Sequence, residues 1–118
     1  MITGFHHIAL LISSEKSLDF YKGLGFIESF RKQRANDCIV LLDGFGMQLE
    51  VFIDNRHPGR VLDLSEPFGT RHFSLKVNDL EETVRMLNLE HTDIGSDWTG
   101  IKYCYIQDPD GNQIELHE

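Results

Sequence analysis

The first half of the chain contains four short apolar or alternating stretches typical of β-strands, with one helical stretch between the first two. The pattern predicts strands at residues 5–12, 26–32, 38–42 and 47–53, and a helix at residues 15–22. Leu18 and Tyr21 share one face of this helix. Ser14 is suited to cap its start, and Gly23 or Gly25 to end it. The first half is therefore predicted to have the order β-α-β-β-β.

The second half repeats this order of elements. Strands are predicted at residues 72–77, 92–96, 101–107 and 113–117, with the weakest signal at 92–96. Leu80, Val84 and Leu87 follow one another at i, i+4 and i+7, the period of an amphipathic helix. Asp79 is placed to cap this helix, with Glu82 as its partner in a capping box. Turn residues at 108–111 precede the last strand, as residues 43–46 do in the first half.

The two halves also match residue by residue. A spacing of 65 residues separates His7 from His72 and Glu50 from Glu115, and residues 46–51 read like residues 111–116. Such an internal repeat is typical of duplicated structural units. We therefore predict an α+β fold built from two βαβββ modules in tandem. The whole chain, 1–118, would be a single domain with repeat halves 1–53 and 71–118 and a linker at 54–70 that is rich in Pro, Gly, Asp and Arg.

Composition limits the kinds of binding partner and the cellular compartment that we expect for this protein. The formal net charge of −8 leaves no cationic excess for phosphates, so we expect no nucleic-acid partner. No apolar run reaches the length of a membrane span, and residues 1–5 lack the features of a signal peptide, so we expect a cytoplasmic protein without a membrane partner. Cys38 and Cys104 each stand alone in an apolar strand, which predicts buried, reduced thiols.

The repeated histidines and glutamates are the candidate metal ligands. Strand alternation puts Glu50 on the opposite face from Leu49 and Val51, and Glu115 opposite Ile114 and Leu116. A carboxylate among residues fit for burial is costly unless it is paired or bound to a metal. One such His or Glu alone would ordinarily be structural or solvent-facing. The matched spacing in both halves instead favours a divalent metal site with ligands His7, Glu50, His72 and Glu115.

The other histidines have weaker claims. His6 competes with His7 for the first ligand position, but alignment of the repeats favours His7, because the residues after it match those after His72. His57, His91 and His117 have no repeat partner and are expected at the surface, although His117 would face the site if the last strand continues.

Several motifs resemble the vicinal-oxygen-chelate superfamily. They are His7-Ile8-Ala9-Leu10, then Phe20-Tyr21 and Leu24-Gly25-Phe26, and the ending Asp108-Pro109-Asp110-Gly111-Asn112-Gln113-Ile114-Glu115. Superfamily members include glyoxalase I, fosfomycin-resistance thiol transferases, extradiol dioxygenases, methylmalonyl-CoA epimerase and bleomycin-resistance proteins. The resemblance covers nearly the whole chain. It implies a glyoxalase/bleomycin-resistance/dioxygenase-type fold.

The ligand set resembles one group within this superfamily. Bacterial glyoxalase I has a His-Glu-His-Glu pattern, which His7, Glu50, His72 and Glu115 match. Transferases and dioxygenases use His-His-Glu, the epimerase resembles His-Gln-His-Glu, and bleomycin-binding members have lost the ligands. Bacterial glyoxalase I typically carries an Arg four residues after the first His, to help hold glutathione. This chain has Leu11 there, so glutathione is not implied by that position.

The resemblance implies a lactoylglutathione lyase-like metalloenzyme. It would isomerise a hemithioacetal or related α-hydroxycarbonyl through an enediolate, with Glu115 moving the proton and Glu50 the candidate for the opposite enantiomer. One divalent ion per site is expected, and Ni²⁺, Co²⁺, Zn²⁺, Mn²⁺ and Fe²⁺ all suit these ligands. A small-molecule substrate and a homodimer are implied as well, with the site inside one chain or shared between two. The alternatives are an epimerase or thiol transferase, a non-catalytic small-molecule-binding or resistance protein, and a closed structural metal site.

The residues that would bind the substrate are not defined by the sequence. Trp98, Tyr103 and Phe52 are weak candidates for lining a pocket, because aromatic residues in strands and loops usually belong to a core or rim. Arg31, Arg34 and Arg71 are weak candidates for binding an anion, and each would more commonly be a solvated charge.

Overall fold

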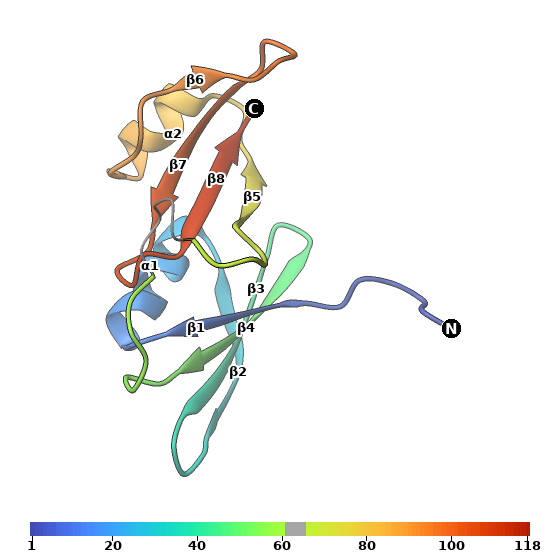
Figure 1. Cartoon of the computed structure of the whole chain (residues 1–118), viewed down its shortest axis with the longest axis vertical. Helices are drawn as coiled ribbons and strands as arrows, with labels where there is room; N and C mark the ends of the chain where they lie inside the picture. The colour runs from blue at the N-terminus through green and yellow to red at the C-terminus, as the bar shows by residue number, and fades with distance from the viewer. Residues whose placement is uncertain (61–65) are drawn as a thin grey trace. The chain divides into compact units, whose positions relative to one another are not determined.

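The computed structural model describes residues 1–60 and 66–118, which form two compact units, Met1–Pro58 and Gly59–Glu118 (Figure 1). Residues 61–65 of the predicted linker lie outside the described residues. Within the described part of the chain, each unit has a four-stranded sheet and one helix, in the order β-α-β-β-β. The predicted α+β class and the two βαβββ modules are therefore confirmed. No described helix is long and apolar enough to span a membrane.

The first unit is a mixed sheet with the strand order β1-β4-β3-β2. Its elements are β1 (Ile8–Ile12), α1 (Glu15–Leu24), β2 (Ile27–Gln33), β3 (Cys38–Gly44) and β4 (Met47–Ile53). The strand β1 runs parallel to β4, and the other neighbours are antiparallel. The helix α1 ends at Gly25, whose φ of 118° and backbone N–H bond to Lys22 make the left-handed cap that glycine permits.

Alternation along the strands determines which side chains of the first unit are buried. Leu49 and Val51 of β4 are fully buried, as are Leu18 and Tyr21 of α1. The intervening Glu50 lies on the other face of the sheet and is only partly covered. The first sheet therefore has one face in the core and one face that remains open, and the open face carries the glutamate.

The second unit has the equivalent order, β5-β8-β7-β6. Its elements are β5 (His72–Lys76), α2 (Leu80–Met86), β6 (Gly95–Ser96), β7 (Lys102–Gln107) and β8 (Gln113–His117). Its core includes Cys104, Ile106, Ile114 and Leu116, which lie on the faces of β7 and β8 opposite to Glu115. Cys38 and Cys104 are both buried and unbridged, as predicted.

The helix α2 shows how far the capping prediction holds. The Asp79 carboxylate accepts a 2.9 Å hydrogen bond from the backbone N–H of Glu82, as an N-cap should. The Glu82 carboxylate instead accepts hydrogen bonds from Arg85. Leu80 and Val84 are buried, but Leu87 is the C-cap residue and 42% exposed, so the apolar face is shorter than its period predicted.

Two predicted strands are three residues shorter in the structure. The first begins at Ile8 rather than residue 5, because parallel pairing starts at Ile8 opposite Leu49. The strand predicted at 92–96 keeps only Gly95 and Ser96. Gly95 pairs with Tyr103, whereas Thr92 exchanges hydrogen bonds with Tyr105, one residue out of that register. The change of register limits the paired strand to two residues.

Candidate functional site

The first unit brings His7 and Glu50 together at the start of β1. Ala9 lies directly opposite Glu50 in the parallel pair β1–β4, and His7, two residues before Ala9, shares its face. The Nε2 atom of His7 lies 3.5 Å from Oε2 of Glu50, and the two side chains are 33% and 28% exposed. This is the first of the two predicted pairs.

The neighbouring His6 contacts the other nitrogen of His7. The two Nδ1 atoms lie 2.8 Å apart, and the rings meet edge to face. His7 therefore directs Nε2 toward Glu50 while His6 holds its Nδ1. A second group of this kind commonly orients a metal-binding imidazole. The geometry agrees with the choice of His7 over His6, which stays a prediction.

The second unit repeats the pair with the same register. Ser74 lies opposite Glu115 in the parallel pair β5–β8, and His72 precedes Ser74 by two residues. The Nε2 atom of His72 lies 3.8 Å from Oε2 of Glu115, with the side chains 26% and 16% exposed. Here the other carboxylate oxygen, Oε1, accepts a 2.8 Å hydrogen bond from the Ser74 hydroxyl.

Both pairs have the donor set and spacing that suit a divalent cation. The distances of 3.5 and 3.8 Å are longer than normal N–H···O hydrogen bonds. Ligands at about 2.1 Å from one ion lie about 3.0–3.4 Å apart for angles between octahedral and tetrahedral, only slightly closer than these pairs. The Nδ1 atom of His72 is buried without a hydrogen-bond partner among the described residues, whereas Nδ1 of His7 contacts His6. The residues present in each unit therefore fit a metal.

The two pairs differ in what surrounds the carboxylate. Glu50 lies opposite Ala9 on one side and Leu41 on the other. Glu115 lies between Ser74 and Tyr105 at the equivalent places. Burial, and then the charge of Glu115, raise the pKa of the Tyr105 phenol. The second carboxylate thus has hydroxyl groups on both neighbouring strands, and the first has only aliphatic side chains there.

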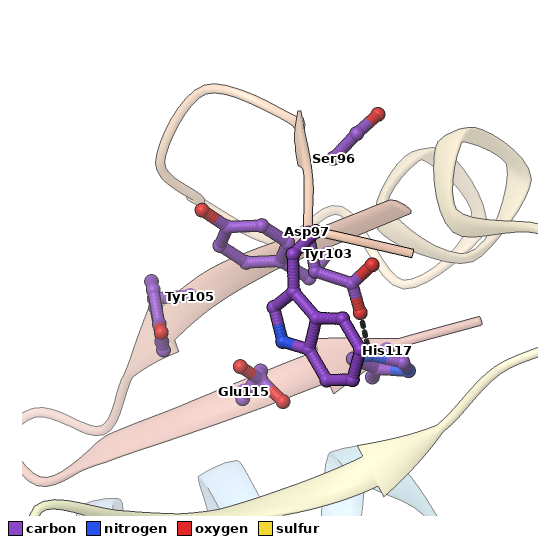
Figure 2. A pocket seen from close by; sticks show the side chains of 7 residues that line it. Ser96, Asp97, Tyr103, Tyr105, Glu115 and His117 are labelled. Atoms are coloured by element: carbon purple, nitrogen blue, oxygen red, sulfur yellow. Dashed lines mark hydrogen bonds and ion pairs between the residues drawn. The ribbon is translucent and has the colours of Figure 1, made fainter. Parts of the chain in front are cut away.

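A pocket of about 600 Å³ opens beside Glu115 in the second unit (Figure 2). It is lined by Ser96, Asp97, Trp98, Tyr103, Tyr105, Glu115 and His117. Its volume is that of a small-molecule site. Trp98 and Tyr103, two of the three aromatic residues considered from sequence, line this pocket, whereas Phe52 lies in the first unit, with Arg34 5.7 Å from its ring centre. His117 faces the pocket rather than standing apart at the surface.

An ion pair fixes one wall of this pocket. The Nε2 atom of His117 lies 3.1 Å from Oδ2 of Asp97, as the dashed line in Figure 2 shows. Hydrogen bonds from Thr99, from the backbone N–H of Ile101 and from His117 lower the pKa of Asp97 to about 2. The Asp97 carboxylate in turn raises the pKa of His117. Strand parity with Glu115 was the sequence signal for His117, but nothing local indicated Asp97.

The arginines considered for anion binding are already paired. Arg31 binds Glu15 and Glu28, Arg34 binds Asp37, and Arg71 binds Glu66. Each guanidinium is at least partly neutralised within its own unit, and this favours the surface-charge interpretation.

A group that the sequence reasoning missed also has metal-binding side chains. Asp79, Glu81 and Glu118 approach closely enough for their carboxylates to share an ion. All three carboxylates have other partners: Asp79 accepts from the backbone N–H of Glu82, Glu81 binds the Lys102 ammonium at 2.8 Å, and Glu118 accepts from the backbone N–H of Leu80. Because these contacts cap and brace α2, the cluster has a structural role already.

The fold and these pairs define a duplicated α+β protein with a His–Glu pair on the open face of each sheet. A family model described as the Glyoxalase/Bleomycin resistance protein/Dioxygenase superfamily matches residues 4–116, and the chain belongs to this superfamily. The predicted resemblance is thereby confirmed.

Solved structures agree with this membership. The chain is 32% identical to the glyoxalase family protein from Enterococcus faecalis, over 98% of this chain and 97% of that one, with a TM-score of 0.88. A lactoylglutathione lyase from Agrobacterium tumefaciens shares the fold at 19% identity, with coverages of 99% and 94% and a TM-score of 0.69.

A third structure of the same fold contains a metal. It is a mutant of a fosfomycin resistance protein from Listeria monocytogenes, complexed with Mn(II) and a dihydroxypropylphosphonic acid. Its identity is 19%, its coverages are 99% and 90%, and its TM-score is 0.68. The comparison with curated proteins finds no match.

Proposed function

We propose that this protein is a glyoxalase I-like metalloenzyme that moves a proton between adjacent carbons of a hemithioacetal or related α-hydroxycarbonyl. The observation that carries the proposal is the repetition of one His–Glu geometry in both units, at the same strand register. In both pairs a histidine Nε2 and a carboxylate oxygen lie 3.5 and 3.8 Å apart, close to the separation of two ligands of one ion. The relatives named as a lactoylglutathione lyase and as a Mn(II) complex support the reaction and cofactor classes.

The proposal assigns two metal ligands to each unit. His7 and Glu50 come from the first unit, and His72 and Glu115 from the second. A bound divalent cation supplies positive charge that stabilises negative charge building up on two neighbouring substrate oxygens. We further propose a homodimer, which the resemblance implies, and a solution mass of two chains would support it.

Within this scheme Glu115 accepts and returns the proton. The Ser74 hydroxyl holds Oε1 of Glu115, which leaves Oε2 on the side that faces His72. A positioned carboxylate of this kind contributes about 10²–10⁴-fold to proton transfer. Glu50 has aliphatic neighbours on both adjacent strands and is the candidate base for a substrate of the opposite hand.

Metal analysis combined with a hemithioacetal isomerase assay tests the proposal. The protein is stripped of metal, reconstituted with Ni²⁺, Co²⁺, Zn²⁺, Mn²⁺ or Fe²⁺, and assayed. Glu115→Gln should lower turnover by about 10²-fold or more while most of the metal is retained. Glu81→Gln is the matched control in the acidic cluster and should keep both metal and turnover.

Two outcomes would contradict the assignment. Metal loss in Glu81→Gln but not in His7→Ala or His72→Ala would move the ion to the acidic cluster. Full turnover in Glu115→Gln would remove Glu115 as the base. Consumption of substrate only when a thiol is added, without an isomerised product, would indicate the transferase alternative instead.

A further inference from the structure

We propose that Trp98, with Tyr103 and Tyr105, selects substrates that carry a flat aryl group next to their two neighbouring oxygens. The inference rests on the proposed function, because it assumes that the reacting carbon of the substrate binds beside the Glu115 carboxylate. It adds the class of the substituent, which the His–Glu pairs alone do not define.

The aromatic side chains stand directly beside the candidate base. Tyr105 lies opposite Glu115 in the antiparallel pair β7–β8, and Tyr103 lies opposite His117. The rings of Tyr103 and Tyr105 meet edge to face with centres 5.8 Å apart. The ring of His72 lies 5.3 Å from that of Tyr105 on the other side. A row of rings therefore leads from a proposed metal ligand across the strand into the pocket.

Trp98 lines the same pocket from the hairpin between β6 and β7. The indole lines the pocket, yet it is 95% exposed. A large apolar ring held in water beside a pocket gains free energy when a ligand covers it. Aromatic rings bring large contact areas and favour other rings in stacked or edge-on arrangements. An aryl substituent satisfies both conditions.

The hairpin that carries Trp98 is held in place before any ligand binds. The Asp97 side chain accepts hydrogen bonds from the backbone N–H and hydroxyl of Thr99, at 2.8 and 2.6 Å. It also accepts from the backbone N–H of Ile101 at 3.1 Å and contacts Nε2 of His117 at 3.1 Å. Preorganisation of this kind reduces the entropy lost on binding. Asp97 thus orders the backbone of the hairpin that carries Trp98.

The first unit lacks such a surface at the equivalent strand positions. Leu41 lies opposite Glu50, and Ile39 lies opposite Phe52. At the corresponding positions of the second unit, Tyr105 and Tyr103 lie opposite β8, the strand that carries Glu115. Phe52 shares the face of Glu50, but the Arg34 guanidinium already lies 5.7 Å from its ring centre. Selection of an aryl group is therefore expected at the pocket of the second unit.

Hydroxamates provide stable probes, since each presents two neighbouring oxygens in one plane. Benzohydroxamate carries an aryl group, cyclohexanecarbohydroxamate a saturated ring of similar size, and acetohydroxamate a methyl group. Binding to the Mn²⁺-loaded and metal-free protein is measured by calorimetry. Trp98 is the single tryptophan of the chain, so its fluorescence reports pocket occupancy directly.

The wild-type protein should bind benzohydroxamate about 10-fold more tightly than acetohydroxamate and about 3-fold more tightly than the cyclohexyl compound. Trp98→Ala should weaken benzohydroxamate about 3- to 10-fold and leave acetohydroxamate unchanged, whereas Trp98→Phe should keep most of the preference. Phe68→Ala removes another fully exposed aromatic residue outside the pocket and should change nothing.

Equal binding of the benzo and aceto compounds, or an unchanged preference in Trp98→Ala, would overturn the inference. A cyclohexyl compound that binds as well as the benzo compound would also overturn it, because the pocket would then select bulk and not a flat ring. The isomerase assay is separate: a protein that lacks turnover but keeps the Trp98-dependent preference refutes the proposed reaction alone. Turnover without that preference refutes the aryl selection alone.

Discussion

The hydroxyl of Ser74 offers a direct test of how Glu115 is positioned, because the matching position in the other half of the repeat has no hydroxyl. Ser74 lies opposite Glu115 and donates a 2.8 Å hydrogen bond to it. At the matching register of the first unit, Ala9 lies opposite Glu50 and has no hydroxyl. The prediction is that Ser74→Ala slows turnover while Ser74→Thr, which keeps a hydroxyl, retains it.

The magnitude follows from the geometry of that bond. A hydrogen bond to a charged group contributes about 1.5–3 kcal/mol when well shielded. The Glu115 side chain is only 16% exposed, but Ser74 is itself exposed, so about 1 kcal/mol is the appropriate scale. If that free energy positions the carboxylate for proton transfer, kcat falls about 5-fold. KM should change little, because the hydroxyl contacts the base and not the substrate.

The assay is steady-state hemithioacetal isomerisation with metal content and thermal unfolding measured in parallel. Ala9→Ser is the reciprocal variant, which gives Glu50 a hydroxyl in the same register, and it should leave the turnover that depends on Glu115 within about 2-fold. Unchanged kcat in Ser74→Ala, with metal content and melting temperature preserved, would refute the reasoning. Equal losses in Ser74→Thr would show that packing, not the hydroxyl, is responsible.

Two further predictions concern stability. Gly111→Ala should destabilise the protein by about 1–3 kcal/mol in denaturant unfolding, because φ is +87° and an added Cβ would lie 2.2 Å from the Arg60 carbonyl oxygen. Gly46→Ala is the control: φ is +76° but the added Cβ meets open space, so the loss of stability should be smaller. Equal losses in the two variants would refute the steric contribution at Gly111. The Arg31 guanidinium lowers the pKa of Glu28 from 4.5 to about 2, so Glu28 stabilises the fold above pH 4.5 and loses this effect as the pH falls toward 2. Glu28→Gln should flatten that part of the stability–pH curve by about 1 kcal/mol or less, and an unchanged curve would contradict it.

The sheet faces could be predicted from sequence because strand alternation depends only on local order. Leu49 and Val51 are buried while Glu50 between them is not, and the same holds for Ile114, Glu115 and Leu116. The pairing of His7 with Glu50 and of His72 with Glu115 followed from the repeat, and each unit brings its pair together. Their role as metal ligands remains a prediction.

The surroundings of the pairs were not predictable, because they depend on contacts distant in sequence. The Ser74 hydroxyl reaches Glu115 across 41 residues, and Asp97 meets His117 across 20. The presence of a serine or an aspartate in the sequence does not predict which distant residue it will contact. The Trp98 hairpin likewise depends on hydrogen bonds that converge on one carboxylate, which no periodicity reveals.

The most informative difference between the halves arises from their turns. In the first unit Gly44 pairs with Met47, so Phe45 and Gly46 alone form the turn, and Leu41 comes to lie opposite Glu50. In the second unit Gln107 pairs with Gln113, so residues 108–112 form a longer turn.

That longer turn shifts the strand pairing relative to the repeat alignment and places Tyr105 opposite Glu115. The spacing of 65 residues would instead match Tyr105 to Val40, which is buried in the first unit's core. A difference of one residue in strand register therefore decides whether the side chain at this repeat position faces the core or the pocket. This shift places tyrosines opposite the glutamate strand in one half of a duplicated fold and aliphatic residues there in the other half, although the His–Glu spacing is the same in both.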